Sequence, residues 1–317
     1  MQPKKIDFEM LHVFVTDRCN MRCPHCYVDS TGRYTDELTT EEMTDLFQDL
    51  NSINFTDGIH IEGGEPFLRK DLIDILTVLN DLSKVTIATN GTIPYRPEFD
   101  ELKGIQRIGF SVEGVTQETH AKLRPNNLKK LLDNMVSFQD NGFSIQSRTT
   151  LTSQNYGEIE GIIAKDADRG IPIARFMAFT PVGRGTENQH LELDMQQYRK
   201  SIENYIQTVK KYGDKVMIKL SVPTPIAEKL DLKNAETVAR IERSICYKGC
   251  DQAAIASNGD VFQCYNNLGY PKNKYGNIRD KNFSEIISSD DFGIKTQCPN
   301  KSCVSKERGY THLINKS

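Results

Sequence analysis

Short apolar runs alternate with amphipathic segments along the chain as far as residue 179. The runs are rich in Ile, Val, Phe and Thr, which is typical of buried β-strands. They span residues 11–16, 59–62, 85–89, 107–112, 143–151 and 173–179. Helical patterns follow several of them, at 68–82, 125–139 and 159–168. Thr39 and Glu42 have the spacing of a capping box, so another helix is expected after the first run.

Six strands separated by single helices predict a parallel sheet with right-handed crossovers. Six such units are enough to curl the sheet into an open barrel. The expected fold class is therefore α/β, a partial (β/α)6 barrel of the TIM type with a small C-terminal extension. Active-site residues of such barrels lie where the strands end at their carboxyl side, so the loops after the runs should carry the chemistry.

The pattern changes after Phe179. A Gly-rich bend at 181–185 is followed by predicted elements at 193–212 (helix), 215–221 (strand) and 283–289 (helix). We expect a barrel over 1–190, a helical linker over 191–240 and a cysteine-rich domain over 241–317. Arg184 in the bend is open to two interpretations, a contact to an anionic substrate or a solvent-exposed turn arginine.

Charge and hydropathy exclude several function classes. The chain has 40 Lys and Arg against 43 Asp and Glu, a net charge of -3, which offers no basic field for nucleic acid. The first ten residues contain no uncharged apolar stretch, and no run approaches a membrane span of about eighteen apolar residues. We expect no nucleic acid or membrane partner and a cytoplasmic location, where the eight cysteines would hold metals rather than form disulfides.

Cys19, Cys23 and Cys26 form a C-x3-C-x2-C motif directly after the first strand. Three thiolates on so short a loop can each bind one iron of a 4Fe-4S cluster and leave the fourth iron open to a small molecule. A zinc site with a distant fourth ligand, or reduced cysteines without metal, remain open on spacing alone. The second strand ends in the motif Glu62-Gly63-Gly64-Glu65-Pro66, which should lie beside this loop.

With both motifs, the chain resembles the radical S-adenosylmethionine (radical SAM) enzymes, whose signature is C-x3-C-x2-C plus a Gly-Gly-Glu-Pro motif closing the second strand. The resemblance implies that Cys19, Cys23 and Cys26 bind a 4Fe-4S cluster whose open iron chelates S-adenosylmethionine. In that family the cluster cleaves the sulfonium bond reductively, and the resulting 5'-deoxyadenosyl radical takes a hydrogen atom from the substrate.

The same resemblance implies contacts to the cofactor. Gly63, Gly64 and Glu65 would contact the methionine amino group, and Tyr27 would lie beside the adenine. Ser111 opens the stretch Ser111-Val112-Glu113-Gly114, where relatives show Ser-(hydrophobic)-Asp-Gly, so Ser111 and, more weakly, Arg124 would contact the carboxylate or ribose. Glu113 departs from that pattern. We expect Asn90-Gly91 to form a turn rather than a cofactor contact.

Five further cysteines lie in the last quarter: Cys246, Cys250, Cys264, Cys298 and Cys303. Asn258-Gly259 predicts a hairpin with a two-residue turn, in which Ser257 pairs with Asp260 and Cys264 lies near Cys250. This tail resembles the SPASM and twitch extensions, with the spacing Gly259-x4-Cys264. That implies one auxiliary 4Fe-4S cluster on four of the cysteines, with either Cys298 or Cys303 as a ligand. A zinc knuckle is the alternative. The remaining thiol is a spare cysteine or a hydrogen-atom donor.

Peptide maturation by crosslinking, oxidation or epimerisation is the leading functional hypothesis, because it is frequent in the SPASM and twitch relatives. The alternative is a radical dehydrogenase or epimerase of a sugar, aminocyclitol or nucleoside; a non-catalytic iron-sulfur carrier is a third. A first strand near residue 11 leaves no room for a leader-binding winged-helix domain, so we expect a separate leader-binding protein or leaderless recognition. A reduced flavodoxin or ferredoxin is the expected electron donor.

Overall fold

The computed structural model describes residues 6–30, 35–79, 84–230, 241–244, 252–268, 271–289 and 292. The described strands are β1 (Ile6–Phe14), β2 (Ile53–Glu62), β3 (Val85–Thr89), β4 (Arg107–Ser111), β5 (Ile145–Leu151), β6 (Ile173–Ala178), β7 (Met217–Pro223), β8 (Ile241–Ser244), β9 (Gln252–Ile255), β10 (Asp260–Phe262) and β11 (Lys274–Asn277). The described helices are α1 (Thr40–Asp49), α2 (Leu72–Thr77), α3 (Gln117–Leu123), α4 (Leu128–Asp140), α5 (Ile159–Asp168), α6 (Met195–Tyr212), α7 (Thr224–Lys229) and α9 (Phe283–Ser288).

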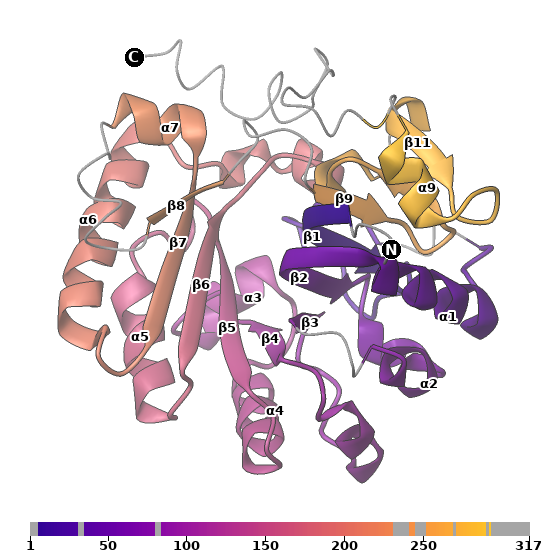
Figure 1. Ribbon diagram of the computed structural model, residues 1–317. Coiled ribbons are helices and arrows are strands. Elements are labelled where there is room, and N and C mark those ends of the chain that lie inside the picture. The colour runs from indigo at the N-terminus through magenta and orange to yellow at the C-terminus, as the bar shows by residue number, and fades with distance from the viewer. Residues whose placement is uncertain are drawn as a thin grey trace.

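The six predicted strands are confirmed as β1 to β6, and each pairs in parallel with the next. The strand predicted at 215–221 is β7, which extends the sheet beside β6, and β8 follows beside β7. In the described part of the chain the strands form one curved sheet in the order β11-β10-β9-β1-β2-β3-β4-β5-β6-β7-β8. The sheet is therefore an open α/β barrel, with helices on its outer side (Figure 1).

Apolar side chains on the outer face of the sheet form the core against the helices. Ile59 and Ile61 of β2 are buried with Phe47 of α1 and Ile75 of α2 in the largest cluster. The residues between them, such as His60, alternate to the opposite, inner face, because successive side chains of a strand point to opposite sides. The polar residues that alternate with these core positions, such as His60, therefore lie in the barrel interior.

Local signals explain most helix boundaries. Thr39 and Glu42 form the predicted capping box at the start of α1. The helix expected at 68–82 is shorter, because Pro66–Leu68 form a 3-10 turn and the described helix runs only from Leu72 to Thr77. The helix expected at 125–139 begins at Leu128, where the side chain of Asn127 caps it.

The C-terminal extension continues the barrel sheet. Strand β9 pairs in parallel with β1 and in antiparallel fashion with β10. The predicted hairpin exists, but the predicted register was wrong by one residue: Val261 pairs with Ile255, so Ala256 rather than Ser257 faces Asp260. Gly259 takes a φ of +87°, and a three-residue loop with glycine at its left-handed position replaces the two-residue turn.

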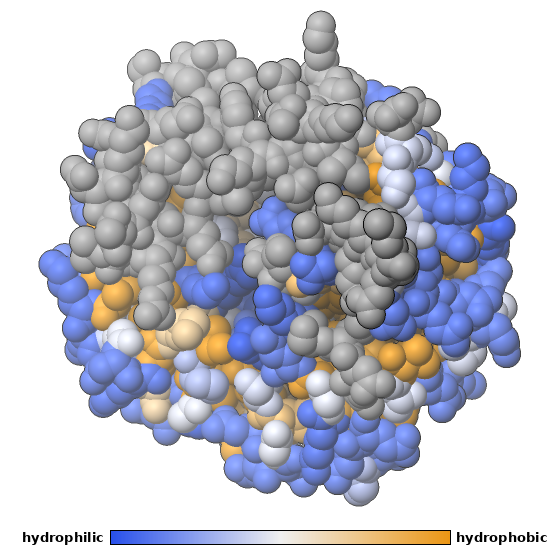
Figure 2. Space-filling model, viewed as in Figure 1, coloured by the Kyte–Doolittle hydropathy of each residue, from blue (hydrophilic) through white to orange (hydrophobic). Residues whose placement is uncertain are grey.

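Hydrophilic side chains cover most of the lower and right-hand rim of the molecule, with hydrophobic ones between them (Figure 2). None of the described helices is long and apolar enough to cross a membrane.

Candidate functional site

The loop after β1 carries the first three cysteines at the carboxyl edge of the sheet. Cys23 is buried, whereas Cys19 and Cys26 are half-buried, and the Cys26 amide donates to the Cys23 carbonyl at 3.2 Å. Burial raises the pKa of the Cys19 thiol to about 11 and raises that of Cys23 as well, and the neighbouring Cys26 raises the pKa of both further. Without a positive partner such as a metal, Cys19 and Cys23 are therefore protonated at neutral pH.

Arg184 holds this cysteine loop in place, and its interpretation as a solvent-exposed turn arginine was wrong. Its side chain is only 8% exposed. It donates to the Cys23 carbonyl at 2.9 Å and pairs with Asp29 at 2.7 Å. The bend beside it packs so closely that a Cβ on Gly183 would lie 2.3 Å from the Tyr27 carbonyl oxygen. Arg184 therefore ties the loop after β6 to the cysteine loop.

Beside Cys23 lies a buried polar group made of His25, Glu113 and Arg124. Glu113 Oε1 is 3.0 Å from Arg124 Nη2 and 3.4 Å from His25 Nε2. Burial alone would raise the pKa of Glu113, but His25 and Arg124 outweigh it and lower that pKa to about 2. The positive charge of Arg124 also lowers the pKa of the Cys23 thiol, against the effect of burial. The predicted cofactor contact Arg124 thus lies beside the cysteine loop.

The paired glycines after β2 pack against the backbone of the cysteine loop. The Gly64 amide donates to the Thr16 carbonyl and the Glu65 amide to the Arg18 carbonyl, each at 2.9 Å. A Cβ would lie 2.6 Å from Thr16 O at Gly63, and 2.3 Å from Arg18 O at Gly64. Only glycine fits at either position, so these residues set the spacing between the two motifs.

The side chain of Glu65 points into the protein. It is fully buried, and its carboxylate accepts bonds from the Asn90 amide at 2.7 Å and from the Thr89 hydroxyl at 2.9 Å. Asn90 forms the expected turn, since its side chain accepts from the Thr92 amide and Gly91 has a φ of +72°. Glu65 therefore fixes the loop after β2 to the end of β3, and what this motif presents outward is backbone.

Tyr27 lies between the cysteine loop and the inner face of the barrel. Its hydroxyl donates to Glu62, and burial together with Glu62 raises its pKa well above the usual value, so Tyr27 stays a hydrogen-bond donor. Its ring packs edge-on against Tyr265 of the extension, with 5.4 Å between the centroids. Ser111, the other predicted contact, ends β4, is half-buried, and is in register with Arg148 of β5.

Of the tail cysteines, only Cys264 falls within the described residues, half-buried just after β10. Cys246, Cys250, Cys298 and Cys303 lie outside them, so their predicted convergence stays a prediction. The next residue, Tyr265, packs on His12 of β1 with ring centroids 4.6 Å apart. The extension thus contributes a side chain to the barrel interior.

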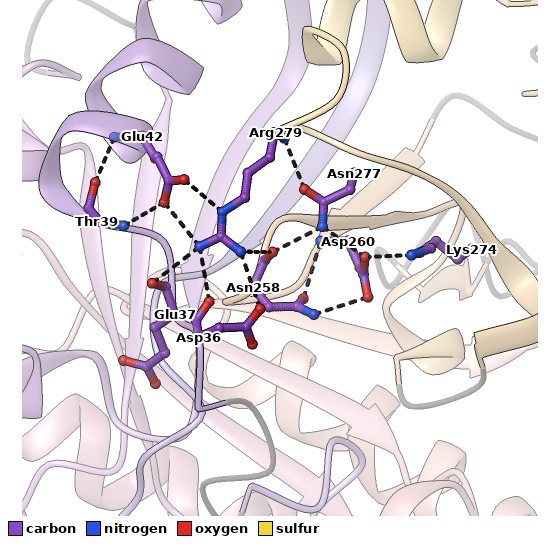
Figure 3. A network of polar contacts seen from close by, with 9 residues as sticks. All are labelled: Asp36, Glu37, Thr39, Glu42, Asn258, Asp260, Lys274, Asn277 and Arg279. Carbon is purple, nitrogen blue, oxygen red and sulfur yellow. Dashed lines mark hydrogen bonds and ion pairs between the residues drawn. The ribbon is translucent and has the colours of Figure 1, made fainter.

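A polar network joins the extension to the segment before α1 (Figure 3). Arg279, just after β11, donates to both carboxylate oxygens of Glu42 at the start of α1 and to the backbone of Asp36. The neighbouring Glu37 carboxylate accepts from the Thr16 hydroxyl at 2.8 Å and from the Asp17 amide at 2.9 Å. The segment before α1 therefore contacts the extension on one side and the cysteine loop on the other.

Two parts of the chain match known protein families. Residues 13–165 match the radical SAM superfamily, and residues 246–304 match the SPASM iron-sulfur cluster-binding domain. The chain belongs to the radical SAM superfamily, SPASM subfamily. It is therefore a radical SAM enzyme, and the two domains imply S-adenosylmethionine and 4Fe-4S clusters as its cofactors.

Two curated relatives extend over most of this radical SAM chain. Fe-coproporphyrin III synthase of Methanosarcina barkeri is 27% identical over 311 residues, covering 90% of this chain and 76% of the relative. The subtilosin biosynthesis protein AlbA of Bacillus subtilis is 25% identical over 297 residues, covering 90% of this chain and 60% of AlbA. Similarity thus reaches enzymes with quite different substrates.

Solved structures confirm the fold. SuiB of Streptococcus suis, bound to its precursor peptide SuiA, superposes with a TM-score of 0.74 at 16% identity and covers 94% of this chain and 69% of the SuiB chain. The structure of anSMEcpe with bound AdoMet gives a TM-score of 0.69 at 17% identity, covering 91% of this chain and 79% of that one. At this identity the likeness concerns architecture.

The residues present fit the radical SAM cofactors. Three thiols on one loop form a donor set for a cubane cluster with one open iron. Arg124 and Arg184 both lower the pKa of the Cys23 thiol and would compensate the negative charge of bound thiolates. The buried Nδ1 of His25 and Nε of Arg124 have no hydrogen-bond partner among the described residues, so polar groups remain available beside the loop.

Sequence reasoning missed the polar residues of the barrel interior, chiefly His12, His60, Arg148 and Arg175. A signal was present: each interrupts a strand otherwise made of residues typical of a buried parallel sheet. Because strands alternate, a charged residue between two buried ones must face the opposite side of the sheet.

Proposed function

We propose that this radical SAM enzyme abstracts a hydrogen atom from a peptide held in the barrel interior. The observation that carries the proposal is the position of Tyr265, which packs on His12 and Tyr27 and makes the SPASM extension one wall of that interior. A substrate there would contact the barrel and the extension together. Similarity to AlbA over 90% of the chain, extension included, favours a peptide as that substrate.

In this proposal Cys19, Cys23 and Cys26 hold the first cluster. With S-adenosylmethionine bound, the cluster supplies a 5'-deoxyadenosyl radical. The chain's own residues prepare the site: the Gly63-Gly64 backbone lies against the cysteine loop, and Glu65 holds it to β3.

Other predicted contacts surround this group. Ser111 and Arg124 would bind the carboxylate or ribose of the cofactor, and Tyr27 would flank the adenine. Arg124 is suited to a carboxylate because a guanidinium keeps its charge when buried, and Glu113 holds it toward the site at 3.0 Å.

The tail cysteines would hold an auxiliary 4Fe-4S cluster: four of Cys246, Cys250, Cys264, Cys298 and Cys303. This predicts about eight irons per chain after anaerobic reconstitution, four for each cluster. A count near four would contradict it. A reduced flavodoxin or ferredoxin would deliver the electron, and the auxiliary cluster would accept one if the reaction is an oxidation.

A small acidic molecule is the second candidate substrate. It is favoured by the arginines of the inner face and by the 27% identity to Fe-coproporphyrin III synthase. In such a reaction the radical chemistry would be the same, but no peptide would be altered.

The test is the mass of short peptides encoded beside the gene, after anaerobic co-expression with the enzyme in heavy water and washing out of exchangeable deuterons. A stable loss of two hydrogens would establish oxidation or crosslinking, and a gain of one deuterium would establish epimerisation. Co-expression with the Cys19→Ala variant is the matched control. Unchanged masses with the active enzyme would refute the peptide proposal.

A further inference from the structure

Basic side chains lie next to one another on the inner face of the barrel. Arg148 of β5 is in register with Arg175 of β6, which is in register with Lys219 of β7. The next residues along β6 and β7, Phe176 and Leu220, belong to the buried core against α5 and α6. Because side chains alternate along a strand, the three cations share the opposite, inner face.

A fourth cation approaches this row from β4. Burial lowers the pKa of Arg107, and the charge of Arg175 lowers it further, so the two guanidiniums lie close enough to repel. The buried Nε of Arg107 and Nη1 of Arg148 have no hydrogen-bond partner among the described residues. A buried donor without an acceptor costs free energy because it loses its hydrogen bonds to water. These atoms therefore favour an acceptor beyond those that the described part of the chain provides.

The chain makes room for Arg148 in the interior. A Cβ on Gly109 would lie 2.7 Å from Arg148 Cδ, so glycine at this position lets the arginine lie across β4. Arg148 then reaches Glu62 of β2, with 3.5 Å between Nη2 and Oε1. Glu62 Oε1 is also 3.5 Å from His12 Nδ1, and its other oxygen accepts from Tyr27. One carboxylate is thus shared by several donors.

A metal ion is the competing occupant. Ligand atoms of His12, His60 and Glu62 all lie within 4.8 Å of one another. However, Glu62 is already bonded to Arg148. Burial lowers the pKa of His60 well below its usual value, and the charges of Arg148 and Arg175 lower it further. The same two charges disfavour a bound cation. A cation would enter a group that is already positive, whereas an anion would balance it.

We infer that Arg107, Arg148 and Arg175 bind an oxyanion group of the substrate, a carboxylate or a phosphate, on the inner face of the barrel. The inference rests on the proposed function, because it makes this face the substrate chamber. For a peptide, the group would be an acidic side chain or the terminal carboxylate; for a small molecule, a carboxylate or phosphate. The anion would anchor the substrate below the cysteine loop and leave its other end toward the radical.

The test is calorimetric titration of the anaerobic holoenzyme, saturated with S-adenosylmethionine, with inorganic phosphate and with succinate. We expect at least one probe to bind. Arg148→Gln should weaken the affinity for that probe by about tenfold or more. Arg148→Lys should weaken it by less, because lysine keeps the positive charge but lacks the paired N–H donors of the guanidinium. Arg107→Gln is a second variant. Lys129→Gln, an exposed cation of α4 paired with Asp133, is the matched control and should bind like the wild type.

Stronger binding of phosphate would identify a phosphorylated substrate, and stronger binding of succinate a carboxylate. The inference is overturned if neither probe binds the wild type, or if Arg148→Gln binds the probes as well as the wild type does. It is also overturned if Arg148→Gln weakens the binding of S-adenosylmethionine and leaves the binding of the probes unchanged. Binding requires no turnover. Unchanged peptide masses would therefore refute the peptide proposal without affecting this result, and absent anion binding would refute the inference without affecting peptide modification.

Discussion

Arg279 of the extension donates two hydrogen bonds to the carboxylate of Glu42 in the barrel, from Nε at 2.6 Å and from Nη2 at 3.1 Å. The same Glu42 completes the capping box of α1, accepting from the Thr39 amide at 2.9 Å. One carboxylate thus stabilises the start of a barrel helix and the docking of the SPASM extension. Paired, parallel bonds of this kind between guanidinium and carboxylate are stronger than single contacts.

Replacing Arg279 with glutamine should lower the melting temperature of the anaerobic holoenzyme. The loss of a partly exposed pair costs about 1 kcal/mol, which corresponds to about 2–4 °C in a chain of this size. The control is Lys122→Gln, which removes an exposed pair with Glu118 on α3 and should change little. Equal melting temperatures for Arg279→Gln and the wild type would show that the Arg279–Glu42 pair contributes nothing to stability.

Gly64→Ala should impair assembly of the first cluster. The new Cβ would lie 2.3 Å from Arg18 O and 2.8 Å from Cys19 Cβ, so the cysteine loop must move. We expect about half of the iron of the wild type after reconstitution, because the tail cysteines are unaffected. Gly157→Ala is the matched control, since a Cβ there meets nothing within 4 Å. Full iron content in Gly64→Ala would mean that the close packing of the two motifs is dispensable.

Asp166 makes the stability of the enzyme depend on pH. Its side chain faces Ser147 under the sheet, and burial raises its pKa to about 7 despite the bond from that hydroxyl. A raised pKa means that the folded state keeps a proton that the unfolded state has released, so stability falls as pH rises toward 7. Between pH 5.5 and pH 8 this costs about 2 kcal/mol.

Asp166→Asn should therefore melt at a higher temperature than the wild type at pH 8, with a smaller difference at pH 5.5. Asp168→Asn, on the exposed side of the same helix, is the control and should follow the wild type at both values. A difference between Asp166→Asn and the wild type that is the same at both pH values would contradict the assignment.

The strands and the motifs could be predicted from the sequence because their signals are local. A buried strand is a short apolar run, and the three cysteines lie within one loop. The register of the hairpin could not be predicted from the sequence. A two-residue and a three-residue loop at Asn258-Gly259 differ by only one residue, and the neighbouring strand β1, which pairs with β9, is distant in sequence. The role of Arg184 was equally invisible, since its partner Cys23 is 161 residues away.

Sequence spacing alone did not predict which residues meet on the inner face of the barrel. His12, Glu62, Arg148 and Tyr265 come from four separate segments, and only the parallel register and the return of the extension to β1 bring them together. The alternation along each strand indicated which residues face inward, but not which of them meet.

The most direct test of the site is the formation of 5'-deoxyadenosine from S-adenosylmethionine by anaerobically reconstituted, chemically reduced enzyme. We predict that the wild type forms it and that the combined Cys19→Ala, Cys23→Ala and Cys26→Ala variant does not, while the tail cysteines still bind iron. Formation of 5'-deoxyadenosine by that variant at the rate of the wild type would contradict the assignment of the first cluster to this loop.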